Sequence, residues 1–193
     1  MFSVLMGLGG CVTQKTTPPP DIAPPESSTS IPHRVDTEAL LPWASEERAF
    51  VVIDKSCGTV SLYRYGQLFR TYSAVFGRKP GRKMHEGDQR TPVGLYMITD
   101  KDLHGRWSRF MRLDYPNEND RYQYRKNLEE GKIPQKNGSH PGLGGAIGIH
   151  GSDNEAFNRA KINWTLGCIS MLNKDVKELY SLVSVGTLAY IKD

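Results

Sequence analysis

The chain has 193 residues, a formal net charge of +4 and 38% hydrophobic residues, which suits one ordinary domain with a tail. This composition is too polar for a protein with several membrane spans, and the sequence has no run of 18 apolar residues. Its three cysteines are too few and too scattered for a disulfide scaffold or a structural zinc site.

The charge is unevenly distributed along the chain. Residues 1–47 hold two basic and six acidic residues, whereas residues 48–193 hold 23 basic and 15 acidic residues. A basic domain behind an acidic tail suggests an anionic partner, and both nucleic acid and a carboxylate-rich polymer fit that description. A solvated surface without such a partner is the alternative explanation.

The N-terminus has the features of an export signal. The first ten residues, MFSVLMGLGG, are apolar and small, and residues 8–11 resemble the lipobox of bacterial lipoproteins. We expect residues 1–11 to be a signal peptide with a lipobox-like segment and Cys11 to be lipidated, because acyl chains anchor a protein to a membrane. The protein would then lie in the periplasm, anchored most naturally to the outer membrane. The alternative is an accidental apolar N-terminus, since no basic residue precedes the apolar run.

A spacer follows the apolar segment. Residues 12–47 are rich in Pro, Ser and Thr, with six prolines between residues 18 and 32. Such a stretch cannot bury a core, so we expect a disordered linker that separates the anchor from the domain at 48–193.

The domain opens with strand patterns. Residues 49–54 (AFVVID) are apolar and β-branched, residues 59–65 (TVSLYRY) alternate, and residues 68–76 read as the return strand after a turn at Gly66 and Gln67. A polar loop is expected over 77–94, and it carries five basic residues: Arg78, Lys79, Arg82, Lys83 and Arg90. This loop is either a rim that attracts an anionic substrate or a solvated segment.

The remainder alternates short strands with helices. Strands are expected at 93–99, 110–113, 144–150, 166–171 and 187–191, and a polar helix at 118–132. A second helix is predicted after Asn173 as N-cap, from the spacing of Val176, Leu179, Tyr180 and Val183, and Gly186 ends it. The fold class is therefore mainly β, a sandwich or barrel-like domain with a few attached helices.

One Cys–His pair carries the chemistry. His150-Gly151 ends one predicted strand, and Thr165, Gly167 and Cys168 lie around the start of the next one. A thiol needs a neighbouring imidazole to become a good nucleophile, and successive N–H groups at 166–168 can stabilise an oxyanion. A buried structural Cys and a satisfied core His are the alternative.

These residues resemble the signature of the L,D-transpeptidase family, peptidoglycan enzymes with a YkuD-type catalytic domain. Residues 87–94 (GDQRTPVG), 52–55 with 62–66, and 185–187 (VGT) resemble other motifs of that domain in the same order. Residues 164–169 (WTLGCI) resemble a proteobacterial branch of the family. The resemblance covers about residues 48–191.

The resemblance implies a role for each matching residue. Cys168 would attack the diaminopimelate-D-Ala bond of a tetrapeptide stem and form a thioester, with His150 as general base and proton donor. The backbone N–H groups of Leu166, Gly167 and Cys168 would form the oxyanion hole. Gly151, Thr165 and Ser170 would contribute to substrate binding. No metal, cofactor or nucleic acid is implied.

The family pattern differs here at two positions. Leu166 stands where many members have His, and Ser170 where many have Arg or Asn, which removes a charge that can hold a substrate carboxylate. The acceptor stays open between a second stem amine in cell wall cross-linking, the lysine of an outer-membrane lipoprotein, and water. An L,D-carboxypeptidase or amidase of the same thiol mechanism is thus one alternative. A non-catalytic peptidoglycan-binding lipoprotein is another.

The remaining candidate residues receive structural interpretations. We expect His85, His104 and His140 to be surface or loop residues, because their spacing does not suit a metal site. Cys57 is expected to be a half-buried thiol in a turn, and a disulfide between it and Cys168 would disable the nucleophile.

Overall fold

The structure is a computed structural model that describes residues 49–193. The predicted signal peptide, the lipidation of Cys11 and the linker lie outside the described residues. The structure therefore does not test the periplasmic location that was inferred from them. These stay predictions.

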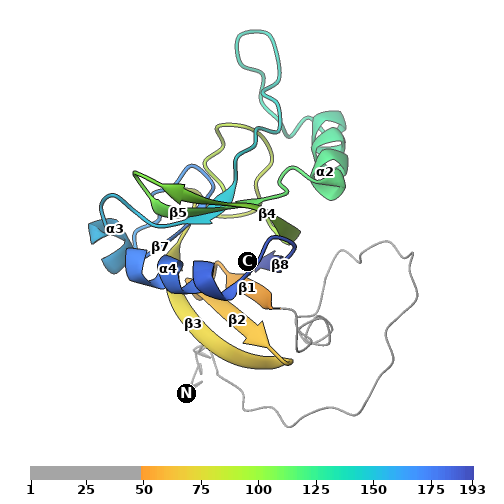
Figure 1. Cartoon of the computed structure of the whole chain (residues 1–193). Helices are drawn as coiled ribbons and strands as arrows, with labels where there is room; N and C mark the ends of the chain where they lie inside the picture. The colour runs from red at the N-terminus through yellow and green to blue at the C-terminus, as the bar shows by residue number, and fades with distance from the viewer. Residues whose placement is uncertain (1–48) are drawn as a thin grey trace, which may run out of the picture. The chain divides into compact units, whose positions relative to one another are not determined.

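Eight strands close into a barrel in the order β1-β2-β3-β7-β6-β5-β4-β8 (Figure 1). The strands are β1 (Phe50–Asp54), β2 (Thr59–Arg64), β3 (Gln67–Val75), β4 (Gly94–His104), β5 (Ser108–Leu113), β6 (Gly148–His150), β7 (Ile169–Met171) and β8 (Leu188–Lys192). The helices are α2 (Glu118–Glu129), α3 (Ala156–Arg159) and α4 (Asn173–Leu182). The prediction of a mainly β, barrel-like fold is confirmed.

The first three strands form the predicted meander. β1 and β2 pair antiparallel with Val51 opposite Leu62, and both side chains are fully buried. The β2–β3 turn lies at Tyr65 and Gly66, one residue earlier than predicted, and both have positive φ (54° and 69°). A two-residue hairpin turn with two left-handed residues matches the twist of the flanking strands, which explains why β3 begins at Gln67.

Two parallel pairs close the barrel and join the segments of the site. β8 pairs parallel with β1, and β6 pairs parallel with β7 with His150 opposite Ser170. Because strand residues alternate between faces, Met111, Ile149 and Ile169 all point into the core, where each is fully buried. The other face of β5, β6 and β7 carries Phe110, Arg112, Gly148, His150, Cys168 and Ser170.

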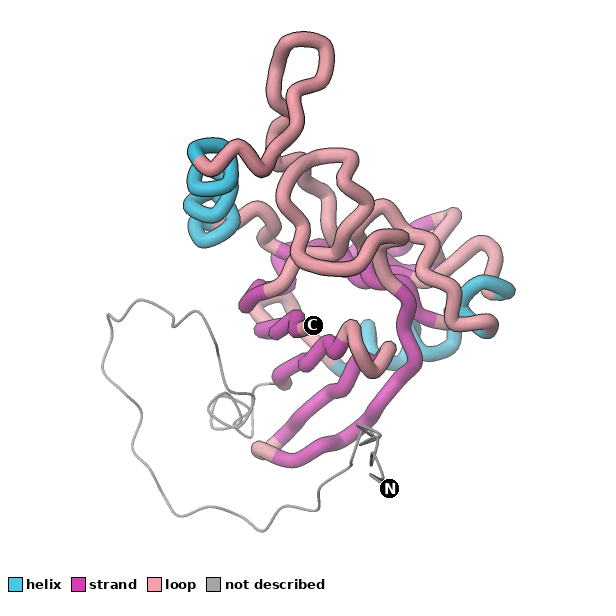
Figure 2. Tube along the Cα trace, turned by 180° about the vertical axis from the view of Figure 1, so that it is seen from behind, coloured by secondary structure: helices cyan, strands magenta, loops and turns pink. Residues whose placement is uncertain are grey.

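α4 and the long loops lie on different sides of this sheet. α4 contributes Val176 and Leu179 to the core cluster and packs against β5 and β6. The loop between β3 and β4 and the segment between α2 and β6 lie together on the other side of the β4–β5 hairpin, as the front and back views show (Figures 1 and 2). The loops are therefore placed over the face that carries His150 and Cys168.

Several element boundaries differ from prediction. β6 and β7 have three residues each, shorter than the predicted 144–150 and 166–171, while β4 extends to His104. Asn173 is the first residue of α4 and not its N-cap, which is Leu172. The Asn173 side chain instead bridges the N–H and carbonyl of Ser152, at 2.9 and 2.7 Å. None of the described helices is long and apolar enough to cross a membrane.

Candidate active site

The strand register brings His150 and Cys168 to one face of the sheet. Phe110 on β5 pairs with His150 on β6, which pairs with Ser170 on β7. Two residues along the strands, Arg112 pairs with Gly148, and the same register places Gly148 beside Cys168. His150 and Cys168 are therefore diagonal neighbours on adjacent strands, a spacing that side chains can bridge.

His150 is held as a neutral imidazole with a defined tautomer. Its Nδ1 lies 2.6 Å from the carbonyl oxygen of Gly151, and a carbonyl only accepts, so Nδ1 carries the proton. Nε2 is then the nitrogen with a free lone pair. The residue is 2% exposed, and burial, with a smaller contribution from the nearby His104, lowers the pKa of His150 to about 4.

An aromatic stack surrounds the imidazole. The Trp107 ring stacks on His150 at 4.6 Å between centroids, and Phe110 lies at 5.9 Å. His104 also stacks on Trp107, at 4.5 Å between ring centroids, and its Nδ1 accepts the backbone N–H of Trp107 at 3.2 Å. His104 is thus half-buried at the end of β4 instead of being a free surface residue. No sequence pattern predicted this stack, apart from the presence of an aromatic residue, Trp107, in the β4–β5 turn.

Cys168 is the free cysteine of the described residues, and Cys57 is disulfide-bonded instead of carrying the expected thiol. The Cys168 thiol donates to the Ala146 carbonyl at 3.4 Å. Burial raises the pKa of this thiol, against smaller lowering effects from the Gly148 backbone, Lys83 and Arg112. Within the described residues, no hydrogen bond joins the thiol to His150, and burial favours the neutral form of each group.

The turn before Cys168 is fastened by Thr165. Its Oγ1 donates to the Cys168 carbonyl at 2.7 Å and accepts the Gly167 N–H at 3.1 Å. Gly167 has φ +145°, and a Cβ there would lie 2.8 Å from the Arg90 carbonyl oxygen. Glycine at 167 therefore makes room for the chain's own loop, and the expected oxyanion donor at Gly167 is already engaged.

The three residues expected to bind substrate are buried and bonded within the protein. Ser170 is fully buried, accepts from Asn158 Nδ2 at 3.0 Å and donates to the Gly151 carbonyl at 3.3 Å. A Cβ on Gly151 would lie 2.1 Å from Asn173 Oδ1, and Thr165 is 3% exposed. Their assignment to substrate binding stays a prediction, and in this structure they position His150 and the turn. Leu166, in contrast, is 66% exposed.

Asn158 extends this support, and no sequence pattern indicates its role. It lies on α3, a four-residue helix too short to show a periodic pattern. Its Oδ1 accepts the Trp164 Nε1 proton at 3.1 Å while its Nδ2 donates to Ser170. The chain of contacts from Trp164 through Asn158 and Ser170 thus ends on the carbonyl that orients His150.

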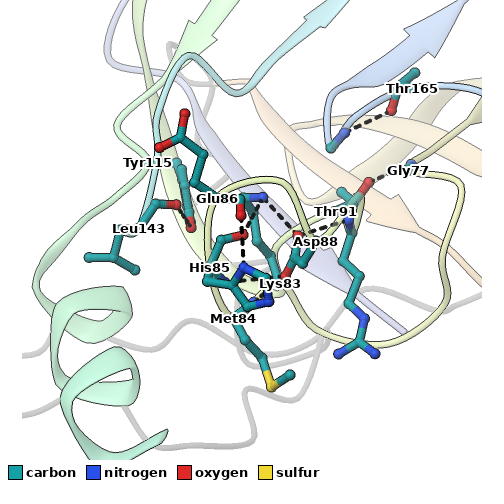
Figure 3. A network of polar contacts seen from close by, with 12 residues as sticks. Gly77, Lys83, Met84, His85, Glu86, Asp88, Thr91, Tyr115, Leu143 and Thr165 are labelled. Carbon is teal, nitrogen blue, oxygen red and sulfur yellow. Dashed lines mark hydrogen bonds and ion pairs between the residues drawn. The ribbon is translucent and has the colours of Figure 1, made fainter. Parts of the chain in front are cut away.

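The basic loop is organised around a buried ion pair (Figure 3). Lys83 Nζ lies 2.9 Å from Asp88 Oδ1, and both side chains are 4% exposed. Asp88 also accepts the N–H groups of Met84, His85 and Arg90, at 2.6, 3.3 and 3.0 Å. Burial acts to raise the pKa of Asp88, but these bonds and Lys83 lower it overall.

This arrangement changes the interpretation of the loop. Both the rim and the solvated-segment hypotheses placed Lys83 at the surface, and that is wrong, whereas Arg78 and Lys79 are exposed. The loop supports the site, because the Arg90 carbonyl lies against Gly167. Within residues 49–193, no group of three His, Cys, Asp or Glu side chains is placed to hold a metal ion.

The domain matches a known protein family. The profile of the YkuD family, the L,D-transpeptidase catalytic domain, matches residues 48–191. The helical cell shape determining protein of Campylobacter jejuni is 23% identical with a TM-score of 0.57, and the match covers 76% of this chain and 48% of that one. Bd1075 of Bdellovibrio bacteriovorus is 21% identical with a TM-score of 0.53, covering 76% and 48%.

An L,D-transpeptidase of Mycobacterium smegmatis is more distant in sequence. It is 16% identical with a TM-score of 0.50, and the match covers 76% of this chain and 59% of that one. This chain therefore spans about half the length of the first two solved structures it resembles, and the likeness to all three is one of fold. No curated protein matches the sequence.

Proposed function

Because the chain belongs to the YkuD family of L,D-transpeptidase catalytic domains, we propose that Cys168 and His150 form its acyl-transfer pair. The donor is the diaminopimelate-D-Ala bond of a peptidoglycan tetrapeptide stem, and the acceptor is an amine of a second stem. The observation that carries the proposal is the parallel β6–β7 register, which places a neutral imidazole and a free thiol on one face. The proteobacterial branch stays part of this proposal.

The reaction begins with proton transfer to His150. Nε2 takes the thiol proton as the Cys168 sulfur attacks the carbonyl carbon, so the thiol leaves the Ala146 carbonyl that holds it at rest. Such contacts are often formed only when substrate binds. Since burial disfavours the imidazolium, His150 gives the proton readily to the departing nitrogen of D-Ala as the C–N bond breaks.

The second half of the reaction reverses these roles. The amine of the acceptor attacks the thioester carbon, His150 removes a proton from the amine, and the same proton returns to the sulfur when the C–S bond breaks. The Gly151 carbonyl keeps the Nδ1 proton in place throughout and stabilises the transient imidazolium.

The oxyanion would be stabilised at the turn before β7. The N–H groups of Leu166 and Cys168 are the donors we propose, because Thr165 already accepts from Gly167. Each donor of this kind contributes roughly 10²–10³ to the rate in other acyl-transfer enzymes. The exposure of Leu166 supports its choice as a donor that a substrate can reach.

Purified tetrapeptide muropeptides test the proposal. We expect cross-linked dimers and free D-Ala with the wild-type protein, and neither with Cys168→Ala. Trimmed monomers without dimers would contradict the amine acceptor and favour water instead. Unaltered muropeptides despite saturable binding to sacculi would contradict an enzymatic function altogether.

A further inference from the structure

Arg112 is an exposed cation in the same row of the sheet as Cys168. Arg112 on β5 pairs with Gly148 on β6, and the β6–β7 register places Cys168 on the other side of Gly148. Strands lie about 4.8 Å apart, so two strand spacings separate Arg112 from Cys168 by roughly 10 Å at the backbone. The Phe110 ring fills the space over Gly148 between them, and the Arg112 guanidinium rests against that ring.

The Arg112 guanidinium is directed along this face. Its Cζ lies 5.5 Å from the centroid of the Phe110 ring, which in turn lies beside His150. The Phe110 ring extends toward Gly148, where a Cβ would lie only 2.6 Å from it. Arg112 therefore rests on the aromatic floor of the site, and its charge acts on the Cys168 thiol.

This cation has no counterion within the described residues. Asp100 pairs with Arg112 on the β4 side, but its Oδ1 accepts the Lys101 N–H at 2.8 Å and forms no ion pair with Arg112. Lys83, the other cation that acts on Cys168, is neutralised by Asp88. Arg112 is thus a positive charge near the thiol that forms no ion pair within the described residues.

We propose that Arg112 binds a carboxylate of the substrate next to the bond that Cys168 attacks, and so determines donor specificity. This inference rests on the proposed function for the identity of the donor. A tetrapeptide stem offers two such carboxylates, the C-terminal one of D-Ala and the one on the diaminopimelate side chain. A planar guanidinium can hold either through two parallel hydrogen bonds.

Amidated substrates test the proposal and identify the carboxylate. Wild-type kcat/KM is measured on three tetrapeptides, one unmodified, one amidated at D-Ala and one amidated at the diaminopimelate side chain. We expect about a ten-fold loss for one of the two amides, the value typical of a charge-assisted hydrogen bond, and Arg112→Gln abolishes that preference. Equal rates on all three substrates would overturn the proposal.

A thiol reagent tests the same contact without the substrate. The Cys168 thiolate displaces iodide from iodoacetate or iodoacetamide and forms an S–C bond, and only iodoacetate carries a carboxylate. A change in the pKa of Cys168 alters both rates equally, so their ratio reports the carboxylate contact alone. We expect Arg112→Gln to lower the iodoacetate-to-iodoacetamide ratio about ten-fold, measured on the Cys168 peptide by mass spectrometry.

Arg109→Gln is the matched control. Arg109 is on the same strand but on the other face, with its guanidinium 5.4 Å from the Tyr180 ring of α4. The Arg109→Gln substitution removes the same charge and is expected to leave the iodoacetate-to-iodoacetamide ratio unchanged. An equal fall in both variants, or an unchanged ratio in Arg112→Gln, would overturn the carboxylate site. If the wild type acts on no muropeptide, the proposed function fails while the reagent ratio still decides the role of Arg112.

Discussion

The two sides of the barrel are stabilised in different ways. In β1, β2 and β3 the strands have five to nine residues, and most of their buried side chains, such as Val51 and Leu62, are apolar. β6 and β7 have three residues each, and the site face beside them buries polar groups, including His150, Ser170 and Asn158. Each of these polar groups is fastened by a specific hydrogen bond.

The difference separates the parts of the sequence that form the barrel from those that form the candidate active site. A ladder with an apolar face tolerates volume-conserving exchange, because any side chain of similar size is buried equally well. A buried polar group needs its partner, because an unsatisfied donor or acceptor costs about 1–3 kcal/mol. Substitutions on the two sides should therefore affect different measurements.

Cys168→Ala should have the largest effect on activity. Loss of the nucleophile is expected to lower turnover of tetrapeptide muropeptides at least about a thousand-fold, while the free energy of unfolding changes by less than about 1 kcal/mol. Leu62→Ala should do the reverse, costing about 2–5 kcal/mol of stability with little change in the alkylation rate of Cys168. Similar stability losses in both variants would contradict the separation. Urea unfolding and muropeptide turnover measure the two effects.

Asp88→Ala tests the polar support of the site. It leaves Lys83 buried without its partner, and breaking such a pair costs about 3–5 kcal/mol. The surface pair of Arg106 and Asp153 is the control, since Asp153→Ala is expected to cause no measurable loss. Urea unfolding of both variants checks this, and equal destabilisation would show that burial of the Lys83–Asp88 pair is unimportant.

The buried imidazole should make stability depend on pH. The pKa of His150 is about 4 in the folded protein and 6.5 in its ordinary state, so the unfolded chain binds the proton first as the pH falls. The stability this provides is fully present above pH 6.5 and is lost between pH 6.5 and 4, about 3 kcal/mol in all. His150→Asn should lack this component.

Urea unfolding at pH 7.5 and 4.5 measures the stability that His150 contributes, as the difference between the wild type and His150→Asn. Carboxylates that titrate in the same range contribute to both proteins and cancel. An identical pH dependence in the two proteins would mean that His150 is not held in its neutral form.

Asp100→Asn should give the smallest effect. Asp100 lies opposite Arg112 in the β4–β5 register without forming an ion pair with it, so its negative charge offsets the guanidinium only weakly. Removing its charge is expected to raise the iodoacetate-to-iodoacetamide ratio at Cys168 about two-fold, in line with the weak interaction of exposed charges. A lower ratio would indicate that Asp100 is needed to orient Arg112.

The sequence predicted the apolar side better than the site. Strict alternation over residues 59–65 placed β2 correctly, because half-buried strands need that pattern. The motif around Cys168 also singled out His150 and Cys168, which the β6–β7 register brings onto one face. The aromatic stack of Trp107 and the support from Asn158 were missed, because they depend on contacts between segments distant in sequence.

Lys83 shows why charge alone misleads. In a polar loop rich in Arg and Lys, the sequence predicts that every cation is solvent-exposed. Only the folded loop shows that Lys83 is buried in an ion pair with Asp88. Asn173 gives a similar lesson, since an Asn before an apolar repeat predicts an N-cap, yet its side chain is used to hold Ser152. In both cases a tertiary contact competed with the local pattern and prevailed.

The most direct test of the central claim is the intact mass of the protein mixed rapidly with a tetrapeptide stem. We predict an adduct equal to the stem minus D-Ala, mapped to Cys168 and absent in Cys168→Ala, with slower formation in His150→Asn. An adduct on another residue, or turnover in Cys168→Ala without any adduct, would contradict thioester formation at Cys168.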